Sequence, residues 1–366
     1  MSIISLYEKS ENLYFVGGIV RDEILGIPSS DIDLTFVGNA IDFVKSLNFG
    51  EITQINEEFG SVHIKIDNQY LDISSTRHET YPNKGQLPVV NEIGCSLKKD
   101  VLRRDFTINS IAKNCKTNKI VDYVNGIEDL NKKQLRVLHD ESFIDDPTRI
   151  IRGLKFAVRF GFELEKHTLE LQNQYLNNVN YEMSYKRLKD ELVDTFEINK
   201  QEVLNKFISQ KMYKLLSKNE FKKSNCNIEK LIAQYKNEIK TSWIVYLGGF
   251  DLSNLPLTKN EKQIIDNYKK ISNYEFTNEF EIYKTFKKVS IETLLIYAHL
   301  KDLGIVKKYL DNLRKIELSI TGEDIKKLGY TPSKRFSECL DAVLKAKLEN
   351  PSLNHAQELD IVKNFM

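Results

Sequence analysis

The amino-acid sequence predicts an α+β fold, in which a small mixed α/β head precedes a long all-helical remainder. Three observations favour this fold class. Short apolar runs bounded by turn residues fill the chain up to residue 75. From Lys99 onward apolar residues recur every three or four positions, which is the spacing of amphipathic helices. After residue 200 Pro and Gly are sparse, and no segment has the alternation expected of a strand.

The strands of the head are predicted from apolar runs that end at turn residues. The first run leads into a Gly-Gly turn, and the last two are separated by the turn pair Asp67-Asn68. The predicted strands are 13–20, 31–37, 62–66 and 69–75. The polar segment 77–94, with Pro82, Gly85 and Pro88, predicts an ordered loop.

Four helices are predicted from Lys99 onward by their apolar spacing, at 105–113, 147–160, 166–175 and 184–196. Pro147 suits the first position of the second of these helices, because a helix start does not need its missing N–H. The Lys/Asn-rich stretch 217–230 predicts a mobile connection.

Composition limits the classes of protein to consider. The chain has 366 residues, enough for two or more domains, and a net charge of +1. Residues 201–366 carry 28 basic against 21 acidic residues (+7), which leaves 25 against 31 (−6) for residues 1–200. A basic second half suits a polyanionic partner, although an ordinary solvated Lys-rich surface gives the same count.

The location of the protein is predicted from what the sequence lacks. Four cysteines without a C-x-x-C pair indicate neither a zinc knuckle nor a disulfide framework. No signal peptide is recognisable, and no apolar stretch is long enough to span a membrane. We therefore expect a cytoplasmic protein without membrane association, and nothing in the sequence predicts a protein partner.

Asp31 and Asp33 are the first candidate catalytic residues. Side chains two apart in a strand project from the same face, so the two carboxylates lie close together and repel each other unless a cation separates them. Mg²⁺ is the hard, oxygen-binding ion that fits, and two ions can activate an attacking hydroxyl and stabilise a departing pyrophosphate. Taken alone, most D-x-D pairs are simply solvated strand or turn residues.

Gly17 and Gly18 precede this pair and are followed by Arg21. A Gly pair between a strand and a helix lets the backbone approach a phosphate, and the helix start directs N–H groups at the anion. Arg21 then offers a charge-assisted contact to a triphosphate. The alternatives are a tight turn for the glycines and a salt bridge within the helix for Arg21.

The segments VGGIVRDEILG and SSDIDLTFVG, at residues 16–38, resemble the opening motif of the polymerase-β-like nucleotidyltransferases. More narrowly, they resemble the family of bacterial CCA-adding enzymes and poly(A) polymerases, and four motifs in the family's order cover 13–197. The resemblance implies a polymerase-β-like head, a neck, a body and a tail. Their expected ranges are 1–136, 137–200, 201–315 and 316–366.

The second matching block is LKKDVLRRDFTINSIAKN, residues 97–114, which carries the family's R-R-D motif. The resemblance implies that Arg104 contacts the nucleotide and that Asp105 helps to select a ribose. Arg103 is a weaker candidate. Adjacent Arg and Asp at a helix start offer phosphate donors and a hydroxyl acceptor within one turn. The alternative is that Asp105 only caps the helix.

The third block, ESFIDDPTRIIRGLKFAVRFGF at 141–162, resembles the family's E-D-x-x-R motif, which selects the base. Cytosine and adenine both present an amine donor beside a ring-nitrogen acceptor. Asp146 can accept from that amine and Arg149 can donate to that nitrogen, so the pair would take C and A and reject G and U. Locally, Asp146 is equally well explained as a helix cap.

Two positions depart from the family pattern in this block. Asp145 stands where the family has Glu, and Lys155 stands where the next Arg is expected. Arg152, between them, is expected to face the triphosphate or the base. Lys155 keeps the positive charge but lacks the planar fork of Arg, so it cannot make a bidentate contact.

The resemblance implies that CTP and ATP are used to build the CCA end of tRNA without a nucleic-acid template, with release of pyrophosphate. The segment 75–90, with Arg77 and Glu79, resembles the flexible loop of the enzymes that add the final A, which argues against CC-only addition. A-only addition stays open, and a poly(A) polymerase is less favoured without a long basic extension. A non-catalytic tRNA-binding module is disfavoured by the intact carboxylates.

Two weaker matches lie further along the chain. SYKRLKDELVDTF, at 184–196, resembles the family's neck helix, and Arg187 and Glu191 are spaced to pair within it. Residues 319–348 resemble the tail, where Lys334 and Arg335 at a helix start are candidate contacts to tRNA phosphate. A solvated helix end explains that pattern equally well.

Overall fold

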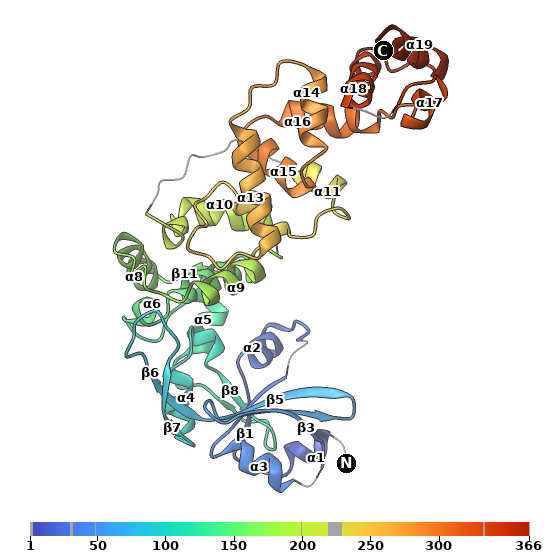
Figure 1. Ribbon diagram of the computed structural model, residues 1–366. Helices are drawn as coiled ribbons and strands as arrows, with labels where there is room; N and C mark the ends of the chain where they lie inside the picture. The colour runs from blue at the N-terminus through green and yellow to red at the C-terminus, as the bar shows by residue number, and fades with distance from the viewer. Residues whose placement is uncertain are drawn as a thin grey trace. The chain divides into compact units, whose positions relative to one another are not determined.

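The computed structural model describes residues 3–29, 32–47, 49–198, 200–218, 229–331 and 334–365. These residues form two compact units, Met1–Asn219 with Ser253–Pro256, and Glu220–Leu252 with Leu257–Met366. Every strand that the structure describes lies in the first unit, and the second is built from helices (Figure 1). The predicted fold class is therefore confirmed, while the finer division into head, neck, body and tail stays a prediction.

A seven-stranded sheet forms the centre of the head. Its strand order is β3-β4-β5-β2-β1-β8-β9, and every neighbouring pair is antiparallel except β2 and β5. The strands are β1 (Leu13–Val16), β2 (Asp33–Phe36), β3 (Glu51–Asn56), β4 (Ser61–Ile66), β5 (Gln69–Ser75), β8 (Ala112–Asn114) and β9 (Ile120–Val121).

One face of this sheet carries the main core of the head. Helices α1 (Ile3–Tyr7) and α3 (Ala40–Ser46) cover that face, and α2 (Gly18–Leu25) lies on the other side (Figure 1). Alternate residues of β4, namely Val62, Ile64 and Ile66, are buried there, as the period of a strand requires.

The pairing of β1 with β2 brings two distant motifs together. The strands are antiparallel and Phe15 pairs with Leu34, so the end of β1 lies beside the start of β2. Gly17, which follows β1, therefore lies near Asp33, which begins β2. The predicted strands at 62–66 and 69–75 are also confirmed, and Asp67 and Asn68 turn between them with φ of 49° and 63°.

Three predictions for the head are wrong. The strand expected at 13–20 ends at Val16, because residues 18–20 already belong to α2. Residues 77–94 are not only a loop, because β6 (Arg77–Thr80) and β7 (Val89–Ile93) form an antiparallel hairpin. The helix expected at 105–113 is a single 3₁₀ turn, η1 (Thr107–Asn109), followed by β8. Residues 105–112 are all buried, so their apolar spacing marks no solvent face. The backbone of β8 instead pairs with β1.

The predicted helices of the neck are confirmed to within two residues. They are α7 (Thr148–Phe160), α8 (Lys166–Asn177) and α9 (Tyr185–Thr195). Helix α7 packs against α9, and Gly161 ends α7 in the left-handed region with φ of 67°. The remaining elements of the first unit are α4 (Leu97–Leu102), α5 (Gly126–Lys132), β10 (Gln134–Leu135), α6 (Ser142–Asp145), β11 (Glu163–Leu164), α10 (Lys200–Ser209) and η2 (Met212–Leu215).

The second unit contains α11 (Glu229–Gln234), α12 (Ser242–Leu247), α13 (Lys259–Ser272), α14 (Glu279–Phe286), α15 (Ile291–Leu300), α16 (Leu303–Asp311), η3 (Leu313–Lys315), α17 (Gly322–Lys327), α18 (Lys334–Glu349) and α19 (His355–Phe365). Helix α15 is buried along nearly its whole length, which makes it the centre of this unit. The stretch 217–230, predicted to be mobile, lies mostly outside the described residues. Among the described helices, none has the length and apolarity needed to cross a membrane.

Candidate active site

The residues predicted to bind the nucleotide gather around one cavity of about 420 Å³ in the first unit. They come from α2, from the segment after α4, and from the start of α7. All nine predicted nucleotide-binding residues line this cavity, together with Asp33: Gly17, Gly18, Arg21, Arg104, Asp105, Asp146, Arg149, Arg152 and Lys155. Motifs that are far apart in sequence are thus adjacent in space.

One corner of the cavity is built around Gly17. Its φ of 71° and ψ of −131° are accessible to glycine but strained for other residues. A Cβ at this position would lie 3.4 Å from Nη1 of Arg104 and 3.7 Å from Oδ2 of Asp33. The bare backbone therefore faces a cation and a carboxylate at the N-terminus of α2, an arrangement that suits a phosphate and its metal ion.

The predicted carboxylate pair is described in part. Asp33 begins β2 at the cavity, whereas Asp31 lies outside the described residues. Among the described residues no group of three His, Cys, Asp or Glu side chains is arranged to hold a metal ion. Carboxylate oxygen is the donor type that Mg²⁺ prefers, so the chemistry of Asp33 fits this ion.

Arg104 and Arg103 lie in different surroundings. Arg104 donates from Nη2 to Oδ2 of Asp100 over 3.2 Å, and its buried Nε has no hydrogen-bond partner. Arg103 instead pairs with Asp100 and Glu79, and it lines a neighbouring cavity. Arg104 therefore lines the cavity with Nη1 at the Gly17 corner, whereas Arg103 lines the neighbouring cavity.

Arg21 forms part of the wall of the cavity and is only 4% exposed. Its Nε donates to Asp22 over 2.8 Å, its Nη1 donates to Asn109 over 2.6 Å, and its guanidinium lies over the ring of Phe160. Burial lowers the pKa of Arg21 despite these contacts. The geometry matches the salt bridge within the helix that was the alternative to a triphosphate contact.

The buried Asp105 forms an ion pair with the partly exposed Arg152. Nε and Nη2 of Arg152 lie 2.8 and 2.7 Å from Oδ2 of Asp105, and Nη1 lies 3.1 Å from Oε1 of Glu191. Burial alone would raise the pKa of Asp105, but Arg152 and Asn109 outweigh it and lower the pKa to about 2. The Asp105 carboxylate in turn raises the pKa of Arg152.

The pair predicted within the neck helix is wrong, because both members bind elsewhere. Glu191 pairs with Arg152, and Arg187 donates from Nη2 to Oδ2 of Asp146. The other oxygen of Asp146 accepts from the backbone N–H of Thr148 over 3.1 Å and from its hydroxyl over 2.6 Å. Asp146 therefore holds the start of α7, as expected of a helix cap, and it also lines the cavity.

Arg149 is 3% exposed and is held from three sides. Its Nη1 donates to Oγ of Ser142 over 2.7 Å, and its Nη2 donates to the carbonyl of Arg103 over 2.9 Å and to the hydroxyl of Tyr81 over 3.4 Å. The guanidinium is therefore fixed beside Asp146 before any nucleotide binds.

Sequence reasoning missed several lining residues. Phe156 and Arg159 lie four and seven positions after Arg152 on α7, so the helical period would have found them. No pattern in the sequence indicated that the other three residues would line the cavity. The missed lining residues are Asn109, Phe156 and Arg159, and the two assigned instead to a helix pair are Arg187 and Glu191.

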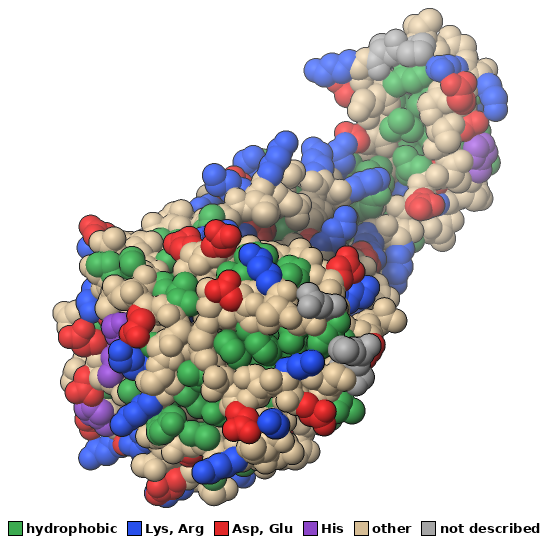
Figure 2. All heavy atoms as spheres, turned by 90° about the horizontal axis from the view of Figure 1, so that it is seen from below, with side chains coloured by type: hydrophobic (Ala, Val, Ile, Leu, Met, Phe, Trp, Pro, Cys, Tyr) green, Lys and Arg blue, Asp and Glu red, His purple; other side chains and the backbone are tan. Residues whose placement is uncertain are grey.

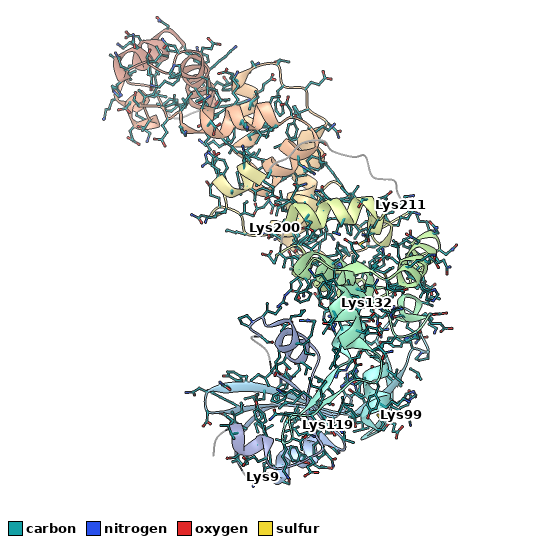
Figure 3. The ribbon with its side chains drawn as sticks, turned by 180° about the vertical axis from the view of Figure 1, so that it is seen from behind. Lys9, Lys99, Lys119, Lys132, Lys200 and Lys211 are labelled. Carbon is teal, nitrogen blue, oxygen red and sulfur yellow. The ribbon has the colours of Figure 1, made fainter. Side chains whose placement is uncertain are left out.

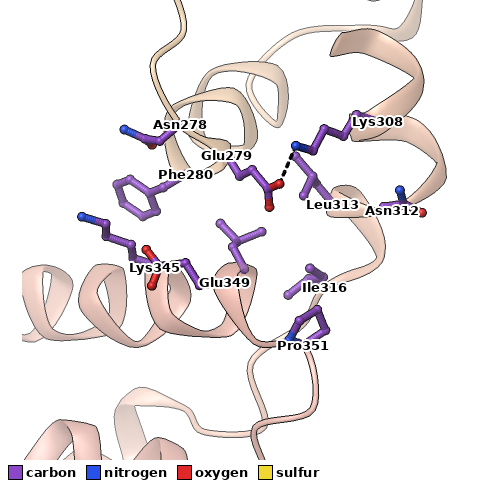
Figure 4. Close-up of a pocket in the computed structure, with 11 residues that line it drawn as sticks. Asn278, Glu279, Phe280, Lys308, Asn312, Leu313, Ile316, Lys345, Glu349 and Pro351 are labelled. Atoms are coloured by element: carbon purple, nitrogen blue, oxygen red, sulfur yellow. Dashed lines mark ion pairs between the residues drawn. The ribbon is translucent and has the colours of Figure 1, made fainter. Parts of the chain in front are cut away.

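The remaining predicted residues lie outside this cavity. Arg77 and Glu79 pair with each other in the β6–β7 hairpin, and Glu79 lines the neighbouring cavity of about 520 Å³. Lys334 begins α18 in the second unit with its side chain 92% exposed, and Arg335 donates to the carbonyl of Phe365. A cavity of about 600 Å³ between α14, η3 and α18 contains the ion pair of Lys308 with Glu279 (Figure 4).

Known proteins are similar to the head and to the whole chain. The model of the poly(A) polymerase head domain matches residues 13–136. The A-adding tRNA nucleotidyltransferase of Halalkalibacterium halodurans is 29% identical over 97% of this chain and 88% of its own length. The corresponding enzyme of Geobacter sulfurreducens is 30% identical over 95% of this chain. The chain spans 44% of that relative, and 20% of the A-adding enzyme of Aquifex aeolicus, to which it is 43% identical.

Solved structures resemble the entire chain. A CCA-adding enzyme without ligand has a TM-score of 0.81 at 26% identity, covering 100% of this chain and 96% of its own. The CCA-adding enzyme of Thermotoga maritima in complex with tRNA has a TM-score of 0.79 at 26% identity, with coverage of 99% and 94%. The head-domain model thus matches residues 13–136, and over its whole length the chain is similar to an A-adding tRNA nucleotidyltransferase and to solved CCA-adding enzymes.

Proposed function

We propose that this chain adds C and A to the 3′ end of tRNA from CTP and ATP, without a nucleic-acid template and with release of pyrophosphate. One observation carries the proposal. A single cavity contains both a phosphate-binding corner, at Gly17 and Arg104, and a base-selecting pair, Asp146 and Arg149. That combination suits an enzyme that must hold a triphosphate and choose between bases in the same site.

The phosphate corner supports nucleotidyl transfer. Enzymes of this family use a divalent metal. Two Mg²⁺ ions held by Asp31 and Asp33 would polarise the attacking 3′-hydroxyl and neutralise the charge that develops on the leaving pyrophosphate. Arg104 and the N–H groups at the start of α2 hold the triphosphate, so that the hydroxyl meets the α-phosphate in line.

The base-selecting pair accounts for the choice of C and A. A carboxylate oxygen accepts more than one hydrogen bond, so Asp146 can receive the base amine while Thr148 and Arg187 still hold it. Arg149 donates to the ring nitrogen beside that amine. Guanine and uracil present the reverse pattern and would leave both side chains without their hydrogen bonds, which disfavours their binding.

A-only addition is the second candidate, and the names of three relatives favour it. The enzymes of Aquifex aeolicus, Geobacter sulfurreducens and Halalkalibacterium halodurans are all A-adding, whereas that of Enterococcus faecalis is CCA-adding and 28% identical. CC-only addition is disfavoured by the hairpin that carries Arg77 and Glu79. We infer a cytoplasmic location, where tRNA, CTP and ATP are available.

The test offers the full chain three tRNAs, ending before CCA, after C and after CC, each with one labelled nucleotide. Extension of all three, with C, C and A respectively, is the result expected of CCA addition. Extension of only the CC-ended tRNA, by one A, would replace the proposal with A-only addition. Incorporation of many A residues would instead indicate a poly(A) polymerase.

A further inference from the structure

We propose that Asn109 is a positioning residue that fixes the carboxylate of Asp105 against the guanidinium of Arg21, and so sets how the cavity distinguishes ATP from 2′-deoxy-ATP. Asn109 ends η1, is 6% exposed, and lines the cavity. The inference rests on the proposed function, because it requires a nucleoside triphosphate in this cavity.

The amide of Asn109 lies between two groups of opposite charge. Its Nδ2 donates to Oδ1 of Asp105 over 2.9 Å, and its Oδ1 accepts from Nη1 of Arg21 over 2.6 Å. A guanidinium only donates and an ionised carboxylate only accepts, so the orientation of the amide is determined by its partners. Neither Asp nor Leu, which have a similar size, can satisfy both partners.

Asn109 is held independently of the cavity. The preceding Thr107 donates from its hydroxyl to Oδ2 of Asp129 over 2.7 Å and from its backbone N–H to the carbonyl of Arg136 over 2.9 Å. Gly126 packs so closely that a Cβ there would overlap the carbonyl oxygen of Thr107. The contacts of Thr107 thus hold the 3₁₀ turn in place, and the Asn109 side-chain amide that the turn carries orients Arg21 and Asp105.

The contacts of Asp105 show what the amide controls. Oδ2 is held by Arg152, while Oδ1 accepts from the backbone N–H of Phe106 over 2.8 Å and from Asn109. Arg21 lies on the far side of the amide and carries the charge that attracts this carboxylate. Without the neutral spacer, Asp105 would turn toward Arg21 and lose the orientation in which it can accept from a ribose hydroxyl.

The experiment measures binding of ATP and 2′-deoxy-ATP to the full chain by calorimetry in the presence of Mg²⁺, without tRNA. Asn109→Leu is compared with Asn114→Leu. Asn114 is also a buried amide of the head, donating to the carbonyl of Glu11 over 2.7 Å, but it does not line the cavity. We expect Asn109→Leu to lower the preference for ATP by about tenfold, the worth of one hydrogen bond to a charged group, while Asn114→Leu leaves it unchanged.

A second variant covers the case in which Asn109→Leu does not fold. Asn109→Asp keeps the shape and the acceptor for Arg21 but places a carboxylate against Asp105, so the preference should fall as well. An unchanged preference in a folded Asn109 variant, or an equal fall in the Asn114 variant, overturns the inference. If the variants give either of these results while the wild type extends tRNA, the inference fails and the proposed function stands. A wild type that binds neither nucleotide overturns the proposed function together with it.

Discussion

At the scale of single residues, two arginines of the cavity differ in how they are paired within the protein. Arg21 is buried with Asp22 and Asn109 as partners, whereas Arg104 has one ion pair and a buried Nε without a partner. We therefore infer different roles for these two arginines, which the sequence assigned to the same triphosphate. We expect Arg104 to contact the nucleotide and Arg21 to hold the wall of the site.

This difference predicts that the same substitution affects nucleotide binding at Arg104 but stability at Arg21. Arg104→Met should raise KM for ATP by about 10-fold or more, since charge-assisted hydrogen bonds to phosphate contribute about 1.5–3 kcal/mol. Arg21→Met should instead lower the free energy of unfolding by about 3 kcal/mol, because it removes the main partner of the buried Asp22. Steady-state kinetics and urea unfolding of both variants check this. Equal losses of stability would contradict the assignment.

Asp105 gives a prediction about acid stability. Its pKa lies at about 2 in the folded chain, below the ordinary value of 3.8, because Arg152 and Asn109 outweigh the effect of burial. A lowered pKa stabilises the fold above about pH 4, and this contribution is lost as the pH falls from 4 toward 2. Asp105→Asn should remove about 2 kcal/mol of pH-dependent stability in that window. Urea unfolding at pH 5 and pH 2 measures it, and an identical pH dependence in both proteins would refute it.

How far the site could be predicted from sequence is also clear at this scale. Ordered motifs were sufficient to name Gly17, Arg104 and Asp146, which the fold brings to one cavity. The partners could not be foreseen, because contacts such as Arg187 with Asp146 join segments 41 positions apart. Helical spacing offered only the local alternative, Glu191.

At the scale of elements, amphipathic helices were predictable and fully buried or fully exposed segments were not. Helix α7 has a buried side and a side that faces the cavity, so the spacing of its apolar residues indicated a helix. Residues 105–112 are buried on all sides, and spacing could not separate a 3₁₀ turn and strand from a helix. The β6–β7 hairpin is a largely exposed ribbon, so it lacks the apolar alternation that marks a strand.

The tip of this hairpin is hydrogen-bonded to the segments around Asp146 and Arg187. The N–H of Gly85 donates to the carbonyl of Asp145 over 3.0 Å, and the N–H of Ser184 donates to the carbonyl of Gly85 over 2.8 Å. Arg187, which holds Asp146, also donates to the carbonyl of Gln86 over 3.3 Å. The hairpin therefore shares its anchors with the residues proposed to choose the base.

Gly85→Ala tests that connection. Gly85 has a φ of 82°, and a Cβ there would lie 3.0 Å from Cα and Cβ of Met183. We expect faster hydrogen exchange in residues 81–88 and reduced incorporation of A. Gly161→Ala is the matched control, because Gly161 also has a positive φ but has nothing within 4 Å of the added Cβ. It should show only the backbone strain, about 1 kcal/mol. Equal effects of both changes would indicate that the packing of the tip does not matter.

At the scale of the whole molecule, charge is distributed unevenly along the chain. Residues 1–200 carry a net −6 and residues 201–366 a net +7, although the total is +1. The face of the first unit shown in Figure 2 has acidic and basic side chains interspersed rather than a field of one sign. The excess of basic residues in the second half is therefore the feature that suits a long polyanion, while we assign the small nucleotide to the cavity of the first unit.

This separation predicts different salt dependences for the two substrates. Binding of tRNA should weaken steeply as salt increases, because each neutralised phosphate releases counterions, whereas binding of ATP in its cavity should change little. Lys334→Glu should weaken tRNA binding and reduce the slope of log K against log salt by about 1, since its side chain is exposed at the start of α18. Lys132, at the end of α5 in the first unit and labelled in Figure 3, is the matched control, because each lysine pairs with a glutamate four positions away: Lys132 with Glu128 and Lys334 with Glu338. If Lys132→Glu changes the slope as much as Lys334→Glu does, binding follows net charge alone, and the tail has no specific role in holding tRNA.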